Sequence, residues 1–154
     1  MQKVIIDSSV WVSFFLKDTN FQRAYALLAR IFRKKDGRKI LVPSIIYLEV
    51  INTLRRSKRN NEEIEEFKNF FKTKKKFQLV KTDEKIYVKA EEIGKKVQLK
   101  TLDLLILTTV FDLKINQFYT FDKKLRKAYI IIKHQWNWKK NPKNRRKQRY
   151  HNTN

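Results

Sequence analysis

Sharp turns are scarce in this chain. Its 154 residues include only two glycines and two prolines, so long and mostly helical elements are expected. Short apolar runs rich in β-branched residues alternate with segments whose apolar residues recur every three or four positions. The short runs predict strands at residues 3–6, 39–42, 77–80, 117–120 and 129–132. This alternation predicts an α/β fold, a three-layer α/β/α sandwich with a central, mostly parallel sheet of about five strands.

The segments between these runs have the apolar spacing of helices. Helices are predicted at residues 10–16, 44–57 and 102–111, and others begin near residues 20, 61 and 82. The apolar content stops near residue 138. We therefore expect a folded domain over residues 1–138 and a basic, disordered tail over residues 139–154.

The charge of the chain is strongly positive, with 37 Lys and Arg against 15 Asp and Glu, a formal +22. Residues 133–154 hold eight basic and no acidic residues, which leaves +14 on residues 1–132. A body this basic attracts polyanions, with nucleic acid as the first candidate and an acidic protein partner as the second. A lysine-rich proteome could raise the lysine count without any function, although acidic residues have not risen to match.

Several other classes of site are excluded by composition. There is no cysteine, so disulfides, thiolate metal sites and cysteine nucleophiles are ruled out. No apolar run reaches 18 residues, so no membrane span is expected. An aspartate at position 7 comes too early for a signal-peptide apolar segment. A cytoplasmic protein fits these observations.

Four acidic residues stand outside the visibly solvated segments. Asp7 follows the first predicted strand and Asp122 follows the fourth, and ligands of parallel α/β proteins collect beyond the carboxyl ends of strands. Glu49 lies on the apolar side of its predicted helix, and Asp103 is the only charge in residues 101–111. Each aspartate could instead be a helix cap, and Glu49 could lie on an exposed helix face. Their joint placement is therefore more informative than any one of them.

Four carboxylates brought together repel one another, and a divalent cation relieves that repulsion. Oxygen ligands without nearby His or Cys favour Mg²⁺ or Mn²⁺ over zinc. An acidic, metal-loaded pocket in a basic protein makes chemical sense, because the basic surface can hold a phosphate backbone while metal ions polarise one phosphodiester.

The segments around these four residues follow a familiar order. They are VIIDSSVW at residues 4–11, PSIIYLEV at 43–50, LDLLILTT at 102–109 and YTFDKKL at 119–125. Together they resemble the PIN domain over about residues 3–132, and most of all its toxin branch, the VapC-like ribonucleases. The leucines after Asp103 depart from the small residues common there in the family.

The resemblance implies Mg²⁺- or Mn²⁺-dependent endonucleolytic cleavage of single-stranded RNA. It makes Asp7, Glu49, Asp103 and Asp122 the catalytic metal ligands, with Ser9 and Thr120 as supporting hydroxyls. It also implies a toxin of a toxin–antitoxin pair, a possible antitoxin partner and a homodimer. Two alternatives stay open, namely an RNA-processing nuclease of the same fold and a catalytically silent RNA-binding or ribosome-associated module.

A basic run follows Glu49 along its predicted helix. It could be an RNA-binding phosphate track leading away from the site, or a solvated helix end where cations favour the helix dipole. The residues concerned are Arg55, Arg56, Lys58 and Arg59.

Overall fold

The computed structural model describes residues 2–33, 38–57, 61–73 and 75–140, the last five of them by their backbone alone. These ranges contain four strands, β1 (Lys3–Ile6), β2 (Lys39–Pro43), β3 (Phe77–Val80) and β4 (Gln117–Tyr119). They also contain the helices α1 (Ser8–Leu16), α2 (Phe21–Arg33), α3 (Ser44–Arg56), α4 (Asn61–Thr73), α5 (Glu84–Gly94), α6 (Thr101–Asp112) and α7 (Lys123–Lys140).

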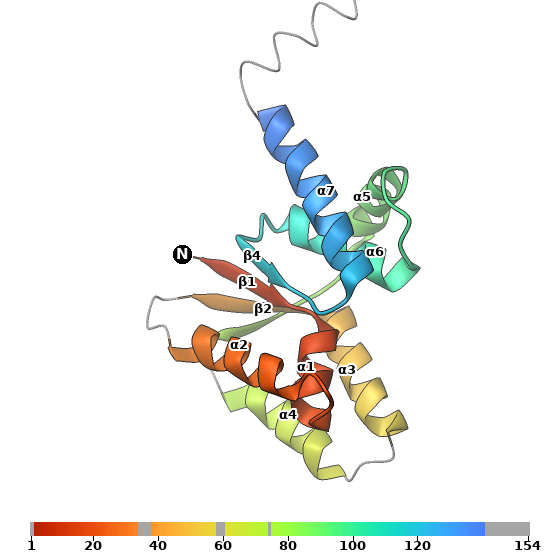
Figure 1. Cartoon of the computed structure of the whole chain (residues 1–154). Coiled ribbons are helices and arrows are strands. Elements are labelled where there is room, and N and C mark those ends of the chain that lie inside the picture. The colour runs from red at the N-terminus through yellow and green to blue at the C-terminus, as the bar shows by residue number, and fades with distance from the viewer. Residues whose placement is uncertain (1, 34–37, 58–60, 74, 141–154) are drawn as a thin grey trace, which may run out of the picture.

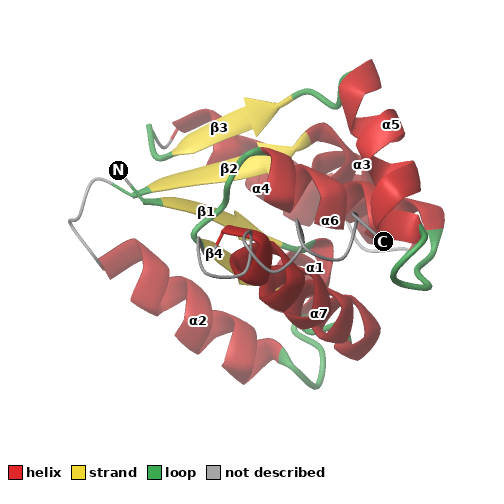
Figure 2. Cartoon of the chain, turned by 90° about the horizontal axis from the view of Figure 1, so that it is seen from above, coloured by secondary structure: helices red, strands yellow, loops and turns green. Residues whose placement is uncertain are grey.

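The sheet is parallel throughout, with strand order β3-β2-β1-β4, and Figure 2 shows β1, β2 and β3 pointing the same way. Helices α1, α2 and α4 lie on one side and α5, α6 and α7 on the other (Figure 1). This arrangement confirms the predicted α/β sandwich. Helix α3 leaves β2 at the carboxyl edge of the sheet and contacts α1, α4 and α6.

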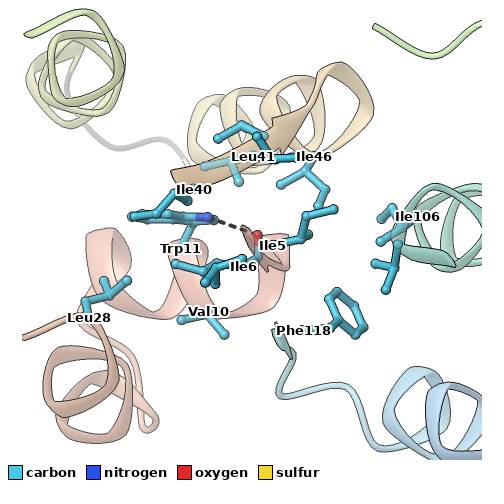
Figure 3. Packing of buried hydrophobic residues seen from close by; sticks show 14 of the residues in the cluster. Ile5, Ile6, Val10, Trp11, Leu28, Ile40, Leu41, Ile46, Ile106 and Phe118 are labelled. Carbon is cyan, nitrogen blue, oxygen red and sulfur yellow. Dashed lines mark hydrogen bonds between the residues drawn. The ribbon is translucent and has the colours of Figure 1, made fainter. Parts of the chain in front are cut away.

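The core lies on both sides of β1, whose Val4 and Ile5 are completely buried. Figure 3 shows Ile5 between the residues of β2 and the side chains of Ile106 and Phe118. On the other face, the buried Trp11 donates a hydrogen bond from Nε1 to the carbonyl oxygen of Ile6 at 3.1 Å. Its indole ring also makes edge contacts with phenylalanines of α4, so α4 is anchored to the end of β1.

The fifth strand predicted at residues 129–132 is wrong, because this segment lies inside α7. Leu125, Ala128 and Ile132 are buried against the core, whereas Ile130 and Ile131 are 48% and 37% exposed. Burial at a spacing of three and four residues is helical, and a four-residue apolar run cannot by itself distinguish a strand from a helix.

Two other boundaries are set by the ends of helices. Helix α5 begins at Glu84, slightly later than predicted, because Asp83 caps it by accepting a hydrogen bond from the N–H of Ile86. Helix α7 extends to Lys140, and the rest of the predicted tail, residues 141–154, lies outside the described residues. None of the described helices is long and apolar enough to cross a membrane.

Candidate functional site

The carboxyl ends of β1 and β4 lie side by side. Ile6 pairs with Tyr119 in the sheet register, and the N–H of Asp7 donates to the carbonyl of Tyr119 at 2.8 Å. The residues that follow both strands, Asp7 on one and Thr120 on the other, are therefore held at the same edge of the sheet. This is the edge at which parallel α/β proteins bind ligands.

Asp7 is 3% exposed, and its carboxylate is held through one of its two oxygens. Oδ2 accepts hydrogen bonds from the Ser9 hydroxyl at 2.6 Å, the Thr120 hydroxyl at 2.8 Å and the Ser9 N–H at 3.3 Å. The last bond makes Asp7 the N-cap of α1. Among the described residues, no hydrogen bond ends on Oδ1, so that oxygen keeps its lone pairs for a ligand. Asp7 is thus both a helix cap and a candidate site residue.

The two hydroxyls also position the chain around Asp122. The Ser9 oxygen accepts from the N–H of Phe121 at 3.0 Å, and the Thr120 oxygen accepts from the N–H of Asp122 at 3.0 Å. Asp122 in turn accepts from the N–H of Leu125 at 2.8 Å and so caps α7. Each hydroxyl therefore donates to Asp7 and accepts from the turn that carries Asp122.

Glu49 reaches this edge from α3 and is half-buried. Its Oε2 is buried and has no hydrogen-bond partner among the described residues. Burial raises the pKa of Glu49, the neighbouring Ser8 hydroxyl lowers it, and the charges of Asp7 and Asp103 add to the rise. Ser8 was not among the residues predicted for the site, although a hydroxyl directly after Asp7 was a signal.

Asp103 lies in the first turn of α6, whose N-cap is Lys100 without a side-chain cap bond. Asp103 is therefore not a helix cap, the alternative that its position in the sequence allowed. Burial raises the pKa of Asp103 first, and the charges of Asp122 and Asp7 raise it further, while Lys100 lowers it. These effects place Asp103 within electrostatic reach of both strand-end aspartates.

Asp103 thus lies within electrostatic reach of the other three predicted acidic residues, Asp7, Glu49 and Asp122. In the described ranges, however, no group of three or more His, Cys, Asp or Glu side chains could hold a metal ion as they are arranged. The donor set nonetheless fits a hard divalent cation, because it offers carboxylate oxygens only and includes the partnerless Oε2 of Glu49.

Of the predicted RNA-binding residues, Arg55 and Arg56 are exposed near the end of α3. Arg55 and Glu49 line the same hollow of about 450 Å³, whose apolar wall includes Leu48 and Leu102. Arg55 therefore lies beside Glu49, and the RNA-binding role of the basic run stays a prediction. Lys58 and Arg59 lie outside the described residues.

Solved structures with a similar fold come from toxin–antitoxin systems. Mycobacterium tuberculosis VapC20, described as a Sarcin-Ricin loop cleaving toxin, has a TM-score of 0.66 and 15% identity over 81% of this chain and 94% of its own. VapBC2 from Rickettsia felis, bound to a promoter DNA fragment, has a TM-score of 0.60 and 16% identity over 82% of this chain and 93% of its own. A toxin–antitoxin complex from Klebsiella pneumoniae has a TM-score of 0.54 and 13% identity over 79% of this chain and 88% of the matched chain. At these identities the likeness shows the fold.

No curated protein matches this sequence. The family model of the PIN domain matches residues 4–131, a span that begins in β1 and ends in α7 and so includes all four acidic residues. With this match over most of its length, the chain belongs to the PIN domain family.

Proposed function

We propose that this protein is a Mg²⁺- or Mn²⁺-dependent endoribonuclease that hydrolyses phosphodiester bonds of single-stranded RNA. The observation that carries the proposal is the Oε2 atom of Glu49, which is buried without a hydrogen-bond partner among the described residues. Burial raises the pKa of Glu49, and the charges of nearby carboxylates raise it further. Such an oxygen is costly without a partner, and a divalent cation would satisfy it. Membership of a nuclease family and the basic surface support the same conclusion.

Asp7, Glu49 and Asp103 would hold the cation, and Asp122 would complete the set. When bound, the cation would supply positive charge at the phosphodiester and lower the pKa of an attacking water. The chain itself supplies positioning. Ser9 and Thr120 fix one oxygen of Asp7, which leaves Oδ1 for coordination. Loss of one ligand is expected to cost orders of magnitude in rate.

The likeness to toxin structures supports a role as the toxin of a toxin–antitoxin pair. An antitoxin protein is the proposed partner, and a homodimer is the proposed assembly. The side chains of Leu48 and Leu102 are 63% and 47% exposed beside Glu49, and apolar surface of this kind suits a protein partner. A cytoplasmic location stays a prediction from the sequence.

The test is cleavage of end-labelled single-stranded RNA with Mg²⁺, with Mn²⁺ and with EDTA. Asp103→Asn should abolish cleavage, whereas Asp112→Asn is a matched control, because Asp112 lies on the same helix but pairs with Lys89 outside the acidic set. Cleavage that survives both EDTA and Asp103→Asn would reject the metal mechanism. RNA binding without cleavage would favour the catalytically silent module, and cleavage of structured precursors alone would favour a processing enzyme.

A further inference from the structure

A second hollow, of about 290 Å³, opens between α7 and the loop after α5. From α7 it is lined by Lys124, Lys127 and Ile131, which share one helix face because they are three and four residues apart. The opposite wall is formed by Lys96 and its neighbours in the loop. This set of three lysines around the opening is called the lysine hollow below.

The positive charge of the lysine hollow is not neutralised by any acidic side chain in its lining. No acidic side chain lines it, and within the described ranges none of its three ammonium groups takes part in an ion pair or hydrogen bond. Downstream of Asp122 the sequence has no acidic residue at all. Three unpaired cations facing one opening repel one another, so the hollow is suited to an anionic ligand.

Both walls of the hollow are continuous along the chain with residues of the acidic site. On one side, Lys124 is two residues after Asp122, which caps the same helix. On the other side, the loop continues into α6, where Lys100 lowers the pKa of Asp103. A polymer that places one phosphodiester at the carboxylates can therefore pass its neighbouring phosphates over these lysines. The apolar side chain of Ile131 gives a surface for a sugar or base.

We propose that the lysine hollow binds the phosphodiester backbone of single-stranded RNA beside the bond that is cut, and so positions the substrate. This inference rests on the proposed function, since it assigns a substrate-binding subsite to that nuclease. It is separate from Arg55 of α3, which lines the hollow beside Glu49. The hollow thus gives the RNA a second direction of exit from the acidic site.

The test compares the wild type with the triple variant Lys96→Gln, Lys124→Gln, Lys127→Gln. Binding of a short labelled oligouridine is followed by fluorescence anisotropy in EDTA at several salt concentrations. The slope of log K against log salt is negative. Each lost phosphate contact should make it less steep by about 0.7, so the loss of three should make it less steep by about 2. The same relation corresponds to a loss of affinity of roughly a hundredfold at 0.1 M salt relative to 1 M.

A matched control removes three exposed cations from the amino-terminal edge of the sheet, with Arg33→Gln, Lys72→Gln and Lys75→Gln. This control should keep nearly the wild-type slope, and circular dichroism should show both variants folded. An equal loss in the control would mean that only net charge matters, which overturns the proposal. Loss of binding to polyglutamate but not to RNA would overturn it too, by assigning the hollow to an acidic protein.

The two proposals fail in different ways. If the wild type binds RNA but does not cut it with Mg²⁺ or Mn²⁺, the proposed function fails while the salt slopes still test the lysine hollow. If the wild type cuts RNA and the triple variant binds with the wild-type slope, the hollow alone is refuted.

Discussion

Thr120→Val removes one hydroxyl and keeps the shape of the side chain. The lost oxygen donates to Asp7 at 2.8 Å and accepts from the N–H of Asp122 at 3.0 Å. A hydrogen bond to a charged group contributes about 1.5–3 kcal/mol, and the exposed N–H of Asp122 can turn to water instead. We therefore expect the free energy of unfolding to fall by about 2 kcal/mol, which lowers the melting temperature by about 4–8 °C in a domain of this size.

The same substitution should slow RNA cleavage by about 10- to 100-fold, the usual cost of losing a partner that orients a metal ligand. Thr120→Ser is the matched control, because it keeps the hydroxyl and should restore most of both properties. Unfolding in urea and single-turnover cleavage measure the two effects. Ser9→Ala should show coupling with Thr120→Val in a double-mutant cycle, since both hydroxyls donate to the same oxygen. The reasoning is refuted if Thr120→Val matches Thr120→Ser in stability and rate.

Three further predictions concern the site and the core. Burial and like charges raise the pKa of Glu49 in the folded chain. Between its ordinary pKa and the raised value, the unfolded chain loses the proton that the folded chain keeps, so the free energy of unfolding falls as pH rises through this interval. Glu49→Gln should therefore melt higher than the wild type at neutral pH without divalent ions and lose this advantage in acid; equal melting at neutral pH would contradict it. Mg²⁺ or Mn²⁺ should raise the melting temperature of the wild type but not of Asp7→Asn, as measured by scanning fluorimetry. Trp11→Ala should cost about 3–5 kcal/mol in urea unfolding, because the indole is fully buried and bonded to Ile6; a cost below 1 kcal/mol would refute its anchoring role.

The sequence was most informative where strands end. Asp7 and Asp122 could be placed at one edge because each follows a short apolar run, and the carboxyl ends of parallel strands share an edge. A helix cap was the alternative interpretation at both positions, and the structure shows that both residues cap helices. The family resemblance supplied the expected roles of Glu49 and Asp103, which periodicity alone left open.

The sequence was least informative where tertiary packing decides. The apolar run at residues 129–132 predicts a strand, but in the structure this segment is part of α7 and packs on the core with one helix face. Nothing local indicates that Thr120 donates to a carboxylate 113 residues away. The lysine hollow was equally hidden, because Lys96 and Lys124 come from different elements that meet only in the folded chain.

The long sequence separation between Asp7 and Thr120 has a consequence for synthesis of the protein. During synthesis β1 is made before β4, so β1 lacks its β4 partner, and Asp7 lacks its Thr120 donor, until residues 117–120 have been translated. Asp103 and Asp122 also arrive late. In the proposed nuclease, the acidic set would therefore be assembled only after residues 117–122 have been made, so a nascent chain that ends before them would not cut RNA.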